Sequence, residues 1–340
     1  MKKSLPLMAA AFLATFAFSP LSHATRLTIA NTTQAGTPMS QTMSAFKQRV
    51  EELSGNKIEV QTSFGGALGN DTQLLQKAQI GSQLQAAQTS GANLGPVVNA
   101  FKIFDVPFLL STPQQSVALF YPDGKLAGPV VDKLQLFLGK KNLRLLYATP
   151  FEFRGILTSS KKIQSPADLK GMKFRVTPNP VERAIVGSWG AAGTSMGISE
   201  VYTSLQTGIV DGLAIPPVTA QGFALNEVAK SFVNLNFQAH PTFVVVNKKF
   251  WDKLPVEEQK LIQQAADEAV MQTKQVHYDA VAASLAAFQK SGAEVTTPAG
   301  DALMAYREPA VKAGEALIAT ELKPDEQALL KEIQAASSIQ

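Results

Sequence analysis

Apolar and polar positions along this chain follow two alternating periods. Residues 26–31, 57–64 and 241–247 form short runs that are apolar or alternate every second position, as is typical of β-strands. Between the first two runs, apolar side chains recur at helical spacing from the cap residue Thr37 to Gly55. Strands and helices that follow one another in this order predict an α/β fold with largely parallel sheets.

The alternation continues through the rest of the chain. The stretch "MKFRVT" (172–177) places Lys173, Arg175 and Thr177 on the face opposite its apolar residues, which predicts a half-buried strand. One further strand is expected to end at residues 89–90, and another to lie near 194–198. A third is expected to cover residues 142–160, where the run passes into a second unit. Further helices are expected over residues 70–80, in the region up to 139, after 178–181 and over 199–207, with a one-turn helix capped by Ser165.

One expected helix is unusually long. No helix-breaking residue occurs between Pro255 and Lys290, and the apolar positions of this segment keep to one stripe. At 1.5 Å per residue the helix would extend for roughly 50 Å, which is more than the width of one small lobe. Two interpretations stay open: a core helix that breaks near His277, or a continuous helix that spans two lobes.

The first residues predict export from the cytoplasm. Lys2 and Lys3 precede an apolar run and a small-x-small pattern ending at Ala24, as in a cleaved secretory signal peptide. Cleavage removes two lysines and no acid, so the formal net charge falls from +4 to +2, which is too small to indicate a nucleic-acid or membrane-surface partner. No later run reaches the roughly 18 apolar residues that span a bilayer, so we expect a mature chain that is not membrane-embedded. The absence of cysteine excludes disulfides and suits a bacterial periplasm.

Several polar side chains fall where predicted strands end. They are Thr32, Thr89, Ser90, Arg154 and Arg175. Ligands of open α/β folds bind at the carboxyl ends of strands, so these positions are candidates for a binding site. Arg175 allows two interpretations, a solvated strand residue or a guanidinium group that binds an anion. A guanidinium group suits a carboxylate because it can donate two parallel hydrogen bonds.

Patterns that would indicate catalysis are weak. The stretch "GTSMG" (193–197) matches the nucleophile elbow G-x-S-x-G, but a glycine-rich segment stands where a buried strand should precede Ser195. The turn "GGALG" (65–69) lacks the lysine of a phosphate-binding loop. The two histidines of the mature chain, His240 and His277, lie far apart and give no metal-ligand spacing. We therefore expect no enzymatic activity, no metal and no cofactor.

Four stretches together resemble the solute-binding proteins of tripartite ATP-independent periplasmic (TRAP) transporters, the dicarboxylate-receptor (DctP-like) family. They are "AFKQRVEELSGNKIEVQTSFGGALG" (45–69), "SPADLKGMKFRV" (165–176), "ISEVYTSLQTGIVDG" (198–212) and "VVVNKKFWDKLPVEEQ" (244–259). The resemblance covers essentially the whole mature chain and implies a two-lobed periplasmic binding protein fold with the long helix as an interlobe spine. We expect residues 1–24 to be the signal peptide, residues 25–151 and about 241–280 to form lobe I, and residues 152–240 and about 281–340 to form lobe II.

The resemblance also implies a function and a site. Members of that family close on a small organic acid and deliver it to membrane permease subunits, and we expect a monomer. In the family the arginine of the "KFRV" strand binds the ligand carboxylate, which is Arg175 here, and an arginine at the position of Arg154 assists it. Other pocket positions of the family fall on Thr32, Thr89, Ser90, Ile198, Ile215 and His240.

One stretch departs from the family pattern. Residues 211–216 read "DGLAIP" where the family reads Asp-Gly-Gln-Glu-Asn-Pro, so Ala214 and Ile215 replace a glutamate and an asparagine. A second charged end on the ligand would lose a partner there, which favours a monocarboxylate with an apolar or aromatic body over a C4-dicarboxylate. The alternative is that Ile215 points into the lobe core. Two other functions stay open, a periplasmic hydrolase that uses Ser195 and a ligand receptor for a membrane sensor kinase.

Overall fold

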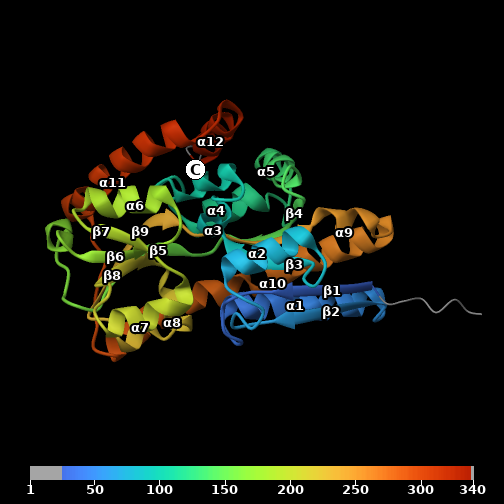
Figure 1. Cartoon of the computed structure of the whole chain (residues 1–340), viewed down its shortest axis with the longest axis horizontal. Coiled ribbons are helices and arrows are strands. Elements are labelled where there is room, and N and C mark those ends of the chain that lie inside the picture. The colour runs from blue at the N-terminus through green and yellow to red at the C-terminus, as the bar shows by residue number, and fades with distance from the viewer. Residues whose placement is uncertain (1–24, 338–340) are drawn as a thin grey trace, which may run out of the picture.

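The computed structural model describes residues 25–337, and its strands form two β-sheets that lie side by side with helices around them (Figure 1). The strands of the first sheet are β1 (Thr25–Ala30), β2 (Ile58–Ser63), β3 (Ala86–Ser90), β4 (Leu143–Thr149) and β10 (Thr242–Asn247), in the order β2-β1-β3-β10-β4. The strands of the second sheet are β5 (Phe153–Thr158), β6 (Lys173–Val176), β7 (Ala192–Ser195), β8 (Gly212–Ile215), β9 (Ser231–Ala239) and β11 (Glu294–Thr296), in the order β11-β9-β5-β8-β6-β7. The predicted signal peptide, residues 1–24, lies outside the described residues.

The prediction of largely parallel sheets is wrong, because both sheets are mixed. β10 is antiparallel to β3 and β4, and β5 is antiparallel to β8 and β9. The cause is the way the chain passes between the sheets. β4 continues into β5, and β9 into β10, through links of only a few residues, so the two crossings run beside each other in opposite directions. Parallel neighbours would need a crossover of a dozen or more residues.

Helices cover both sheets (Figure 1). Those that follow strands of the first sheet are α1 (Pro38–Ser54), α2 (Asp71–Ile80), α3 (Gly91–Leu94), α4 (Pro113–Phe120), α5 (Pro129–Gly139) and α9 (Lys248–Lys253), with the 3-10 helix η1 (Asn99–Asp105). Those of the second part are α6 (Pro180–Ser188), α7 (Val201–Gln206) and α8 (Pro217–Gly222), with the 3-10 helices η2 (Pro166–Leu169), η3 (Ile198–Glu200) and η4 (Leu225–Glu227). The last three helices are α10 (Val256–Lys290), α11 (Gly300–Glu321) and α12 (Pro324–Ser337).

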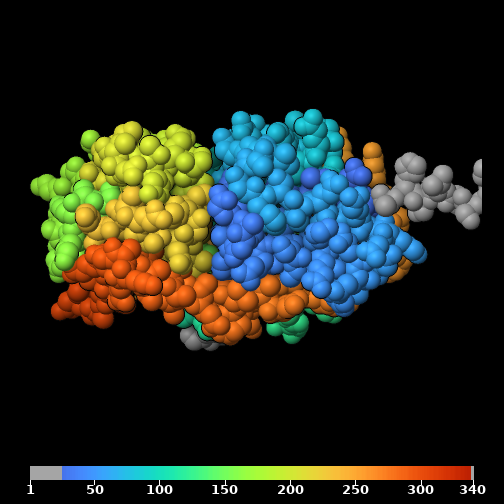
Figure 2. Space-filling view, turned by 90° about the horizontal axis from the view of Figure 1, so that it is seen from below, coloured from blue at the N-terminus to red at the C-terminus, as the bar shows by residue number. Residues whose placement is uncertain are grey.

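The long helix α10 spans both halves of the molecule. It is continuous over 35 residues, which corresponds to a length of about 50 Å, so the interpretation with a break near His277 is wrong. It packs against α1 and β4 beside the first sheet and against α8 and β11 beside the second. In the view of Figure 2, α10 (orange) runs along the lower side of both the blue and the yellow-green halves, which meet along a narrow groove. The two-lobed fold with a spine helix is therefore as predicted.

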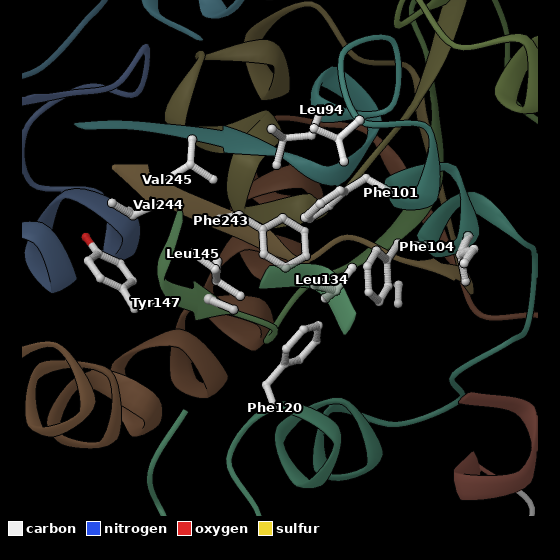
Figure 3. Close-up of a cluster of buried hydrophobic side chains, with 14 of the residues drawn as sticks. Leu94, Phe101, Phe104, Phe120, Leu134, Leu145, Tyr147, Phe243, Val244 and Val245 are labelled. Carbon is white, nitrogen blue, oxygen red and sulfur yellow. The ribbon is translucent and has the colours of Figure 1, made fainter. Parts of the chain in front are cut away.

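Aromatic side chains fill the centre of the first half (Figure 3). Phe243 on the central strand β10 packs edge-on against Phe101, with ring centroids 4.9 Å apart, and lies 5.4 Å from Phe104. Phe120 of α4 meets Phe243 at 5.7 Å. β3 and β10 are buried on both faces, which explains why "PTFVVVN" is apolar throughout and does not alternate.

The C-terminal part of the chain was not resolved into elements by the sequence analysis. The strands β9 and β11 and the helices α11 and α12 were not predicted. α12 contacts α4 and α5, where Glu332 forms an ion pair with Lys133. The division of the chain into two lobes stays a prediction. Within it, these contacts group residues 324–337 with lobe I instead of lobe II.

A buried histidine on α10 ties the spine helix to the first crossing. His277 is 1% exposed, and its ring centroid lies 4.7 Å from that of Phe151 in the link between β4 and β5. Its Nε2 is 3.0 Å from the hydroxyl of Thr42 on α1, and that hydroxyl is 2.8 Å from the hydroxyl of Thr273. Burial lowers the pKa of His277 to about 4, because the charged imidazolium cannot be solvated there.

The depressed pKa of His277 predicts a pH-dependent loss of stability. The unfolded chain takes up a proton near pH 6.5 and the folded chain only near pH 4, so stability is full above pH 6.5 and falls as the pH drops toward 4. His277→Gln should reduce this fall by about 3 kcal/mol at most. The measurement is the free energy of unfolding in urea at several pH values.

Comparing wild type with His277→Gln isolates the contribution of His277 to the pH dependence of the free energy of unfolding. Burial raises the pKa values of Glu152 and Asp105 to about 7, and both groups change stability in the opposite direction between pH 4 and 7. Their contribution is the same in wild type and in His277→Gln, so it cancels in the difference. Identical pH profiles of the two proteins would contradict the prediction.

Candidate functional site

A small cavity lies where the two sheets face each other, with a volume of about 70 Å³. Every residue predicted for the site from the sequence contributes to its lining, namely Thr32, Thr89, Ser90, Arg154, Arg175, Ile198, Ile215 and His240. The structure thus brings together side chains that are up to about 200 positions apart in the sequence. Their roles in binding stay predictions. A larger hollow of about 440 Å³ adjoins the cavity and shares Thr32, Ile198 and Phe223 with it.

The ends of strands position these side chains. β1 ends at Ala30, just before Thr32, and β3 ends with Thr89 and Ser90, whose hydroxyl accepts a hydrogen bond from the Asn93 amide (3.3 Å) at the start of α3. In the second sheet, Arg175 lies on β6 and Ile215 is the last residue of β8. The cavity therefore lies at the carboxyl ends of β1, β3, β6 and β8, as the α/β pattern predicts. Arg154, which was expected at the end of a strand, is instead the second residue of β5, and it reaches the cavity because β5 runs antiparallel to β8.

Arg154 is a fully buried cation. It is 1% exposed, and its Nη1 donates to Glu182 Oε1 at 2.9 Å and to the carbonyl oxygen of Ala214 at 3.0 Å. Its Nε and Nη2 groups have no hydrogen-bond partner among residues 25–337. An unsatisfied buried donor costs free energy, and more when it belongs to a charged group. Arg154 thus offers two nitrogen atoms, with three N–H bonds between them, to a bound molecule or water.

Glu182 fixes the orientation of Arg154. It is 1% exposed and lies in the first turn of α6, where its Oε2 accepts from the Thr177 amide (2.9 Å) and the Thr177 hydroxyl. Each carboxylate oxygen therefore has a distinct partner, and the ion pair is held from both sides. The sequence analysis did not predict Glu182 as a site residue. An acid in the first turn of a helix is ordinary, and only the tertiary structure places it beside Arg154.

Arg175 is buried, which corrects the half-buried strand predicted for "MKFRVT". Phe174, Arg175 and Val176 are all buried, and Arg175 is 5% exposed. Its Nε donates to the carbonyl oxygen of Met196 at 3.1 Å, and within the described residues neither Nη group donates to a protein acceptor. Burial lowers the pKa of Arg175, an effect that Glu182 opposes and Arg154 reinforces. On the polar face of β6, Arg175 is therefore part of the cavity wall, whereas Lys173 at the start of the strand is exposed to solvent.

An acid stands in the same cavity. Asp71, the first residue of α2, lines it and accepts hydrogen bonds from the hydroxyls of Thr89 (3.0 Å) and Thr32 (3.3 Å). Burial raises the pKa of Asp71, while the hydrogen bond from Thr89 and the charge of Arg175 act against this rise. Asp71 falls at the start of the helix predicted over residues 70–80, but its place in the cavity was not predicted. An acid at the start of a helix is explained by the helix alone, so the sequence carries no separate signal.

One side of the cavity is apolar. Ile198, Ile215, Phe223 and Met39 all contribute to its lining. Ile215 is 3% exposed and also packs in the core of the second half with Leu213 and other apolar residues. It is therefore both a core residue and a part of the cavity wall.

His240 lies at the second crossing between the sheets. Its amide donates to the carbonyl oxygen of Glu152 at 2.8 Å. Burial, together with the charges of Arg154 and Arg175, holds the pKa of its imidazole well below the usual range, so the ring is neutral at pH 7. The carboxyl of Glu152 accepts from the hydroxyl of Thr219, another lining residue, at 2.6 Å.

The other candidate chemistries find little support in the site. Ser195 is exposed at the end of the edge strand β7, and no histidine in the described part of the chain hydrogen-bonds to it. No group of three His, Cys, Asp or Glu residues within 25–337 could hold a metal ion.

The described helices were also searched for membrane spans. None of those between residues 25 and 337 is both long enough and apolar enough to cross a bilayer.

Comparison with known proteins gives a consistent result. The family description "bacterial extracellular solute-binding protein, family 7" (DctP) matches residues 29–316. The chain is 32% identical over 228 residues (66% of this chain) to the ectoine-binding periplasmic protein TeaA of Halomonas elongata, and 31% identical over 224 residues (65% of this chain) to a solute-binding protein of Verminephrobacter eiseniae. The aligned part spans 64% of the length of each of these two relatives.

Solved structures show the same likeness. The crystal structure of the sugar-acid-binding protein DctPAm from Advenella mimigardefordensis, in complex with galactonate, superposes with a TM-score of 0.84 at 26% identity. The superposition covers 92% of this chain and 98% of DctPAm, so the two share both halves of the fold.

The buried pair of Arg154 and Glu182 predicts a strongly asymmetric response to mutation. Glu182→Gln leaves a buried guanidinium charge without its counter-ion and should lower the free energy of unfolding by about 3–5 kcal/mol. The double variant Arg154→Met, Glu182→Leu removes both charges and should recover most of this loss. Urea unfolding of the three proteins measures the effect.

The matched control is an exposed ion pair. Arg26 and Glu59 lie 3.2 Å apart with side chains 63% and 43% exposed, so Glu59→Gln should change the free energy of unfolding by less than about 1 kcal/mol. Equal effects of Glu182→Gln and Glu59→Gln would show that burial of the pair does not determine its contribution.

Proposed function

The chain belongs to the bacterial extracellular solute-binding proteins of family 7, the receptors of TRAP transporters, and from this premise we propose that it captures a small organic acid in the cavity between its sheets and delivers it to a membrane permease. The proposal includes action in the periplasm as a monomer, after removal of residues 1–24. It also places the ligand carboxylate on Arg175 and Arg154.

One observation carries this proposal. Two guanidinium groups with unused donors line one buried cavity: Nε and Nη2 of Arg154 and the Nη groups of Arg175. A carboxylate supplies acceptors in the planar arrangement that a guanidinium group prefers, and hydrogen bonds to a charged acceptor are stronger than those to a neutral one. Because both donors are already fixed by Glu182 and Met196, a ligand gains their hydrogen bonds without first ordering the side chains.

The apolar side of the cavity supports a ligand with an apolar or aromatic body and a single carboxylate. Ile198, Ile215 and Phe223 supply hydrocarbon where a second carboxylate would need a donor. Each Å² of apolar ligand surface buried there adds roughly 25 cal/mol of binding free energy. TeaA is described as binding ectoine and DctPAm as binding galactonate, compounds with one carboxylate each, whereas a DctP of Rhodobacter capsulatus binds C4-dicarboxylates. The preference we propose therefore depends on the walls of this cavity.

Arg175→Lys tests the proposed role of the guanidinium group. The ammonium group of lysine cannot donate two parallel hydrogen bonds, so carboxylate binding should weaken by roughly 2–5 kcal/mol, or about thirtyfold or more. Isothermal titration calorimetry with ligands found in a thermal-shift screen of organic acids measures the change. Arg183→Lys on the exposed face of α6 is the matched control and should bind like wild type. Unchanged affinity of Arg175→Lys would overturn the role of Arg175.

Ile215→Asn tests the proposed ligand class. With aromatic or branched monocarboxylates the variant should bind about tenfold more weakly, because an amide replaces apolar contact surface. With succinate or malate it should bind no worse than wild type. The two ligand types are compared by calorimetry on both proteins. Tight binding of succinate by wild type, without measurable binding of apolar monocarboxylates, would contradict the proposal.

A further inference from the structure

The charges at the cavity are balanced before any ligand enters. Arg154 and Arg175 bring two positive charges, and Asp71 and Glu182, which line the cavity or pair with its arginines, bring two negative ones. Two further buried acids, Glu152, which hydrogen-bonds to the lining residue Thr219, and Asp105, whose charge acts on Arg154, add negative charge where they ionise and no positive charge. A dicarboxylate would therefore leave two uncompensated negative charges in a buried site, and a simple monocarboxylate would leave one. A ligand that also carries a cationic nitrogen would leave none.

The hydrogen-bonding groups of the two walls are complementary. The wall from the second sheet presents the unused N–H donors of Arg154. The wall from the first sheet presents acceptors. Asn31 is 2% exposed and donates through Nδ2 to Gln88 Oε1 (2.9 Å), so its Oδ1 remains, with no partner in the described part of the chain. Among residues 25–337, the hydroxyls of Thr32 and Thr89 are the side-chain groups that donate to Asp71, whereas an ionised carboxylate can accept about four hydrogen bonds.

We propose that Asp71 is a specificity-determining residue, whose carboxylate accepts a hydrogen bond from a donor group on a ligand with a single carboxylate. This inference rests on the proposed function, since the arginines hold the carboxylate end. The donor is an N–H or O–H group at the other end of the ligand, and the charge balance favours a cationic nitrogen over a hydroxyl. Asn31 Oδ1 offers a second acceptor on the same wall. Asp71 disfavours a second carboxylate through like-charge repulsion.

The geometry around Asp71 prepares it for this role. The hydroxyls of Thr32, which follows β1, and of Thr89 on β3 hold its carboxylate in place, and the backbone of α2 fixes its Cα. It does not form an ion pair with any described residue. A ligand cation would therefore not have to displace a protein partner. Its gain comes from pairing a charge that is already ordered and already partly removed from water.

Two matched series of probes test the proposal on the wild-type protein. The first is succinate, β-alanine, 3-hydroxypropionate and butyrate, which share a carboxylate and differ only in the end group. The second is terephthalate, 4-(aminomethyl)benzoate, 4-(hydroxymethyl)benzoate and 4-methylbenzoate, which adds an aromatic body. Calorimetry at pH 7 should give the tightest binding for the ammonium member of a series, then the hydroxyl member, with the dicarboxylate at least tenfold weaker than the ammonium member.

Asp71→Asn assigns this preference to the residue. The amide keeps the shape and one acceptor oxygen of the carboxylate but removes its negative charge. The preference for the ammonium member over the hydroxyl member should therefore fall by tenfold or more, and the dicarboxylate should bind more tightly. The methyl member should change by less than threefold. Asp71→Ser is a second variant in case the first folds poorly, with thermal melts as the check. Asp132→Asn, on the exposed face of α5, is the matched control and should behave as wild type.

The outcomes separate the inference from the function on which it rests. In one outcome, carboxylate binding is lost in Arg175→Lys, but the order of affinities among the end groups is identical in wild type and both Asp71 variants. This outcome overturns the role of Asp71 and leaves the receptor function intact. A dicarboxylate that binds wild type most tightly also overturns it. If no member of either series and no compound of a wider organic-acid screen binds wild type, both the proposed function and this inference are overturned.

Discussion

The buried ion pair of Arg154 and Glu182 is the constraint on which the rest of the site depends. Removing two charges from water is costly, and the pair persists only because each remaining polar atom of Glu182 is satisfied by Thr177 and because Ala214 accepts a second hydrogen bond from Arg154. These residues lie on β5, β8 and α6 and, for Thr177, directly after β6. The strands of the second sheet must therefore be in register before the guanidinium group is oriented, and the cavity has its shape only when that sheet is complete.

The two crossings place this site between the two halves of the molecule. Only short links join β4 to β5 and β9 to β10, and the chain crosses between the halves again along α10 and from α11 to α12. Hinge motions use a few terminal residues of elements, and the links that hold Phe151, Glu152 and His240 are of this kind. Glu152 hydrogen-bonds to Thr219 of the wall, and Phe151 packs on His277 of the spine. A change at the cavity is thus coupled by direct contact to the segments about which the lobes would turn.

Much of the fold follows from the sequence, and the misses have physical causes. Local signals such as Thr37 and Gly55 around α1, or Asn70 before α2, were predicted because a cap is decided by neighbouring residues. The mixed sheets were missed because strand direction is set by crossings whose partners are about 90 residues apart. In the site, the residues at strand ends were predicted, whereas Glu182 and Asp71 were missed because an acid at a helix start already has a local explanation. The burial of Arg175 was missed because alternation cannot distinguish a solvent face from the wall of a cavity.

The position of β10 at the centre of the first sheet has a consequence for how the chain folds. β10 lies between β3 and β4, yet it follows them in the sequence by about 150 and 95 residues. A growing chain that has not yet reached residue 247 lacks the strand that joins them, so the inner edges of β3 and β4 stay open and their apolar faces incomplete. Contacts between such distant segments close slowly, because the chain entropy of a long loop is lost before the contact forms. The polypeptide therefore emerges from synthesis without a finished first lobe, which keeps it loosely structured until most of its length is available.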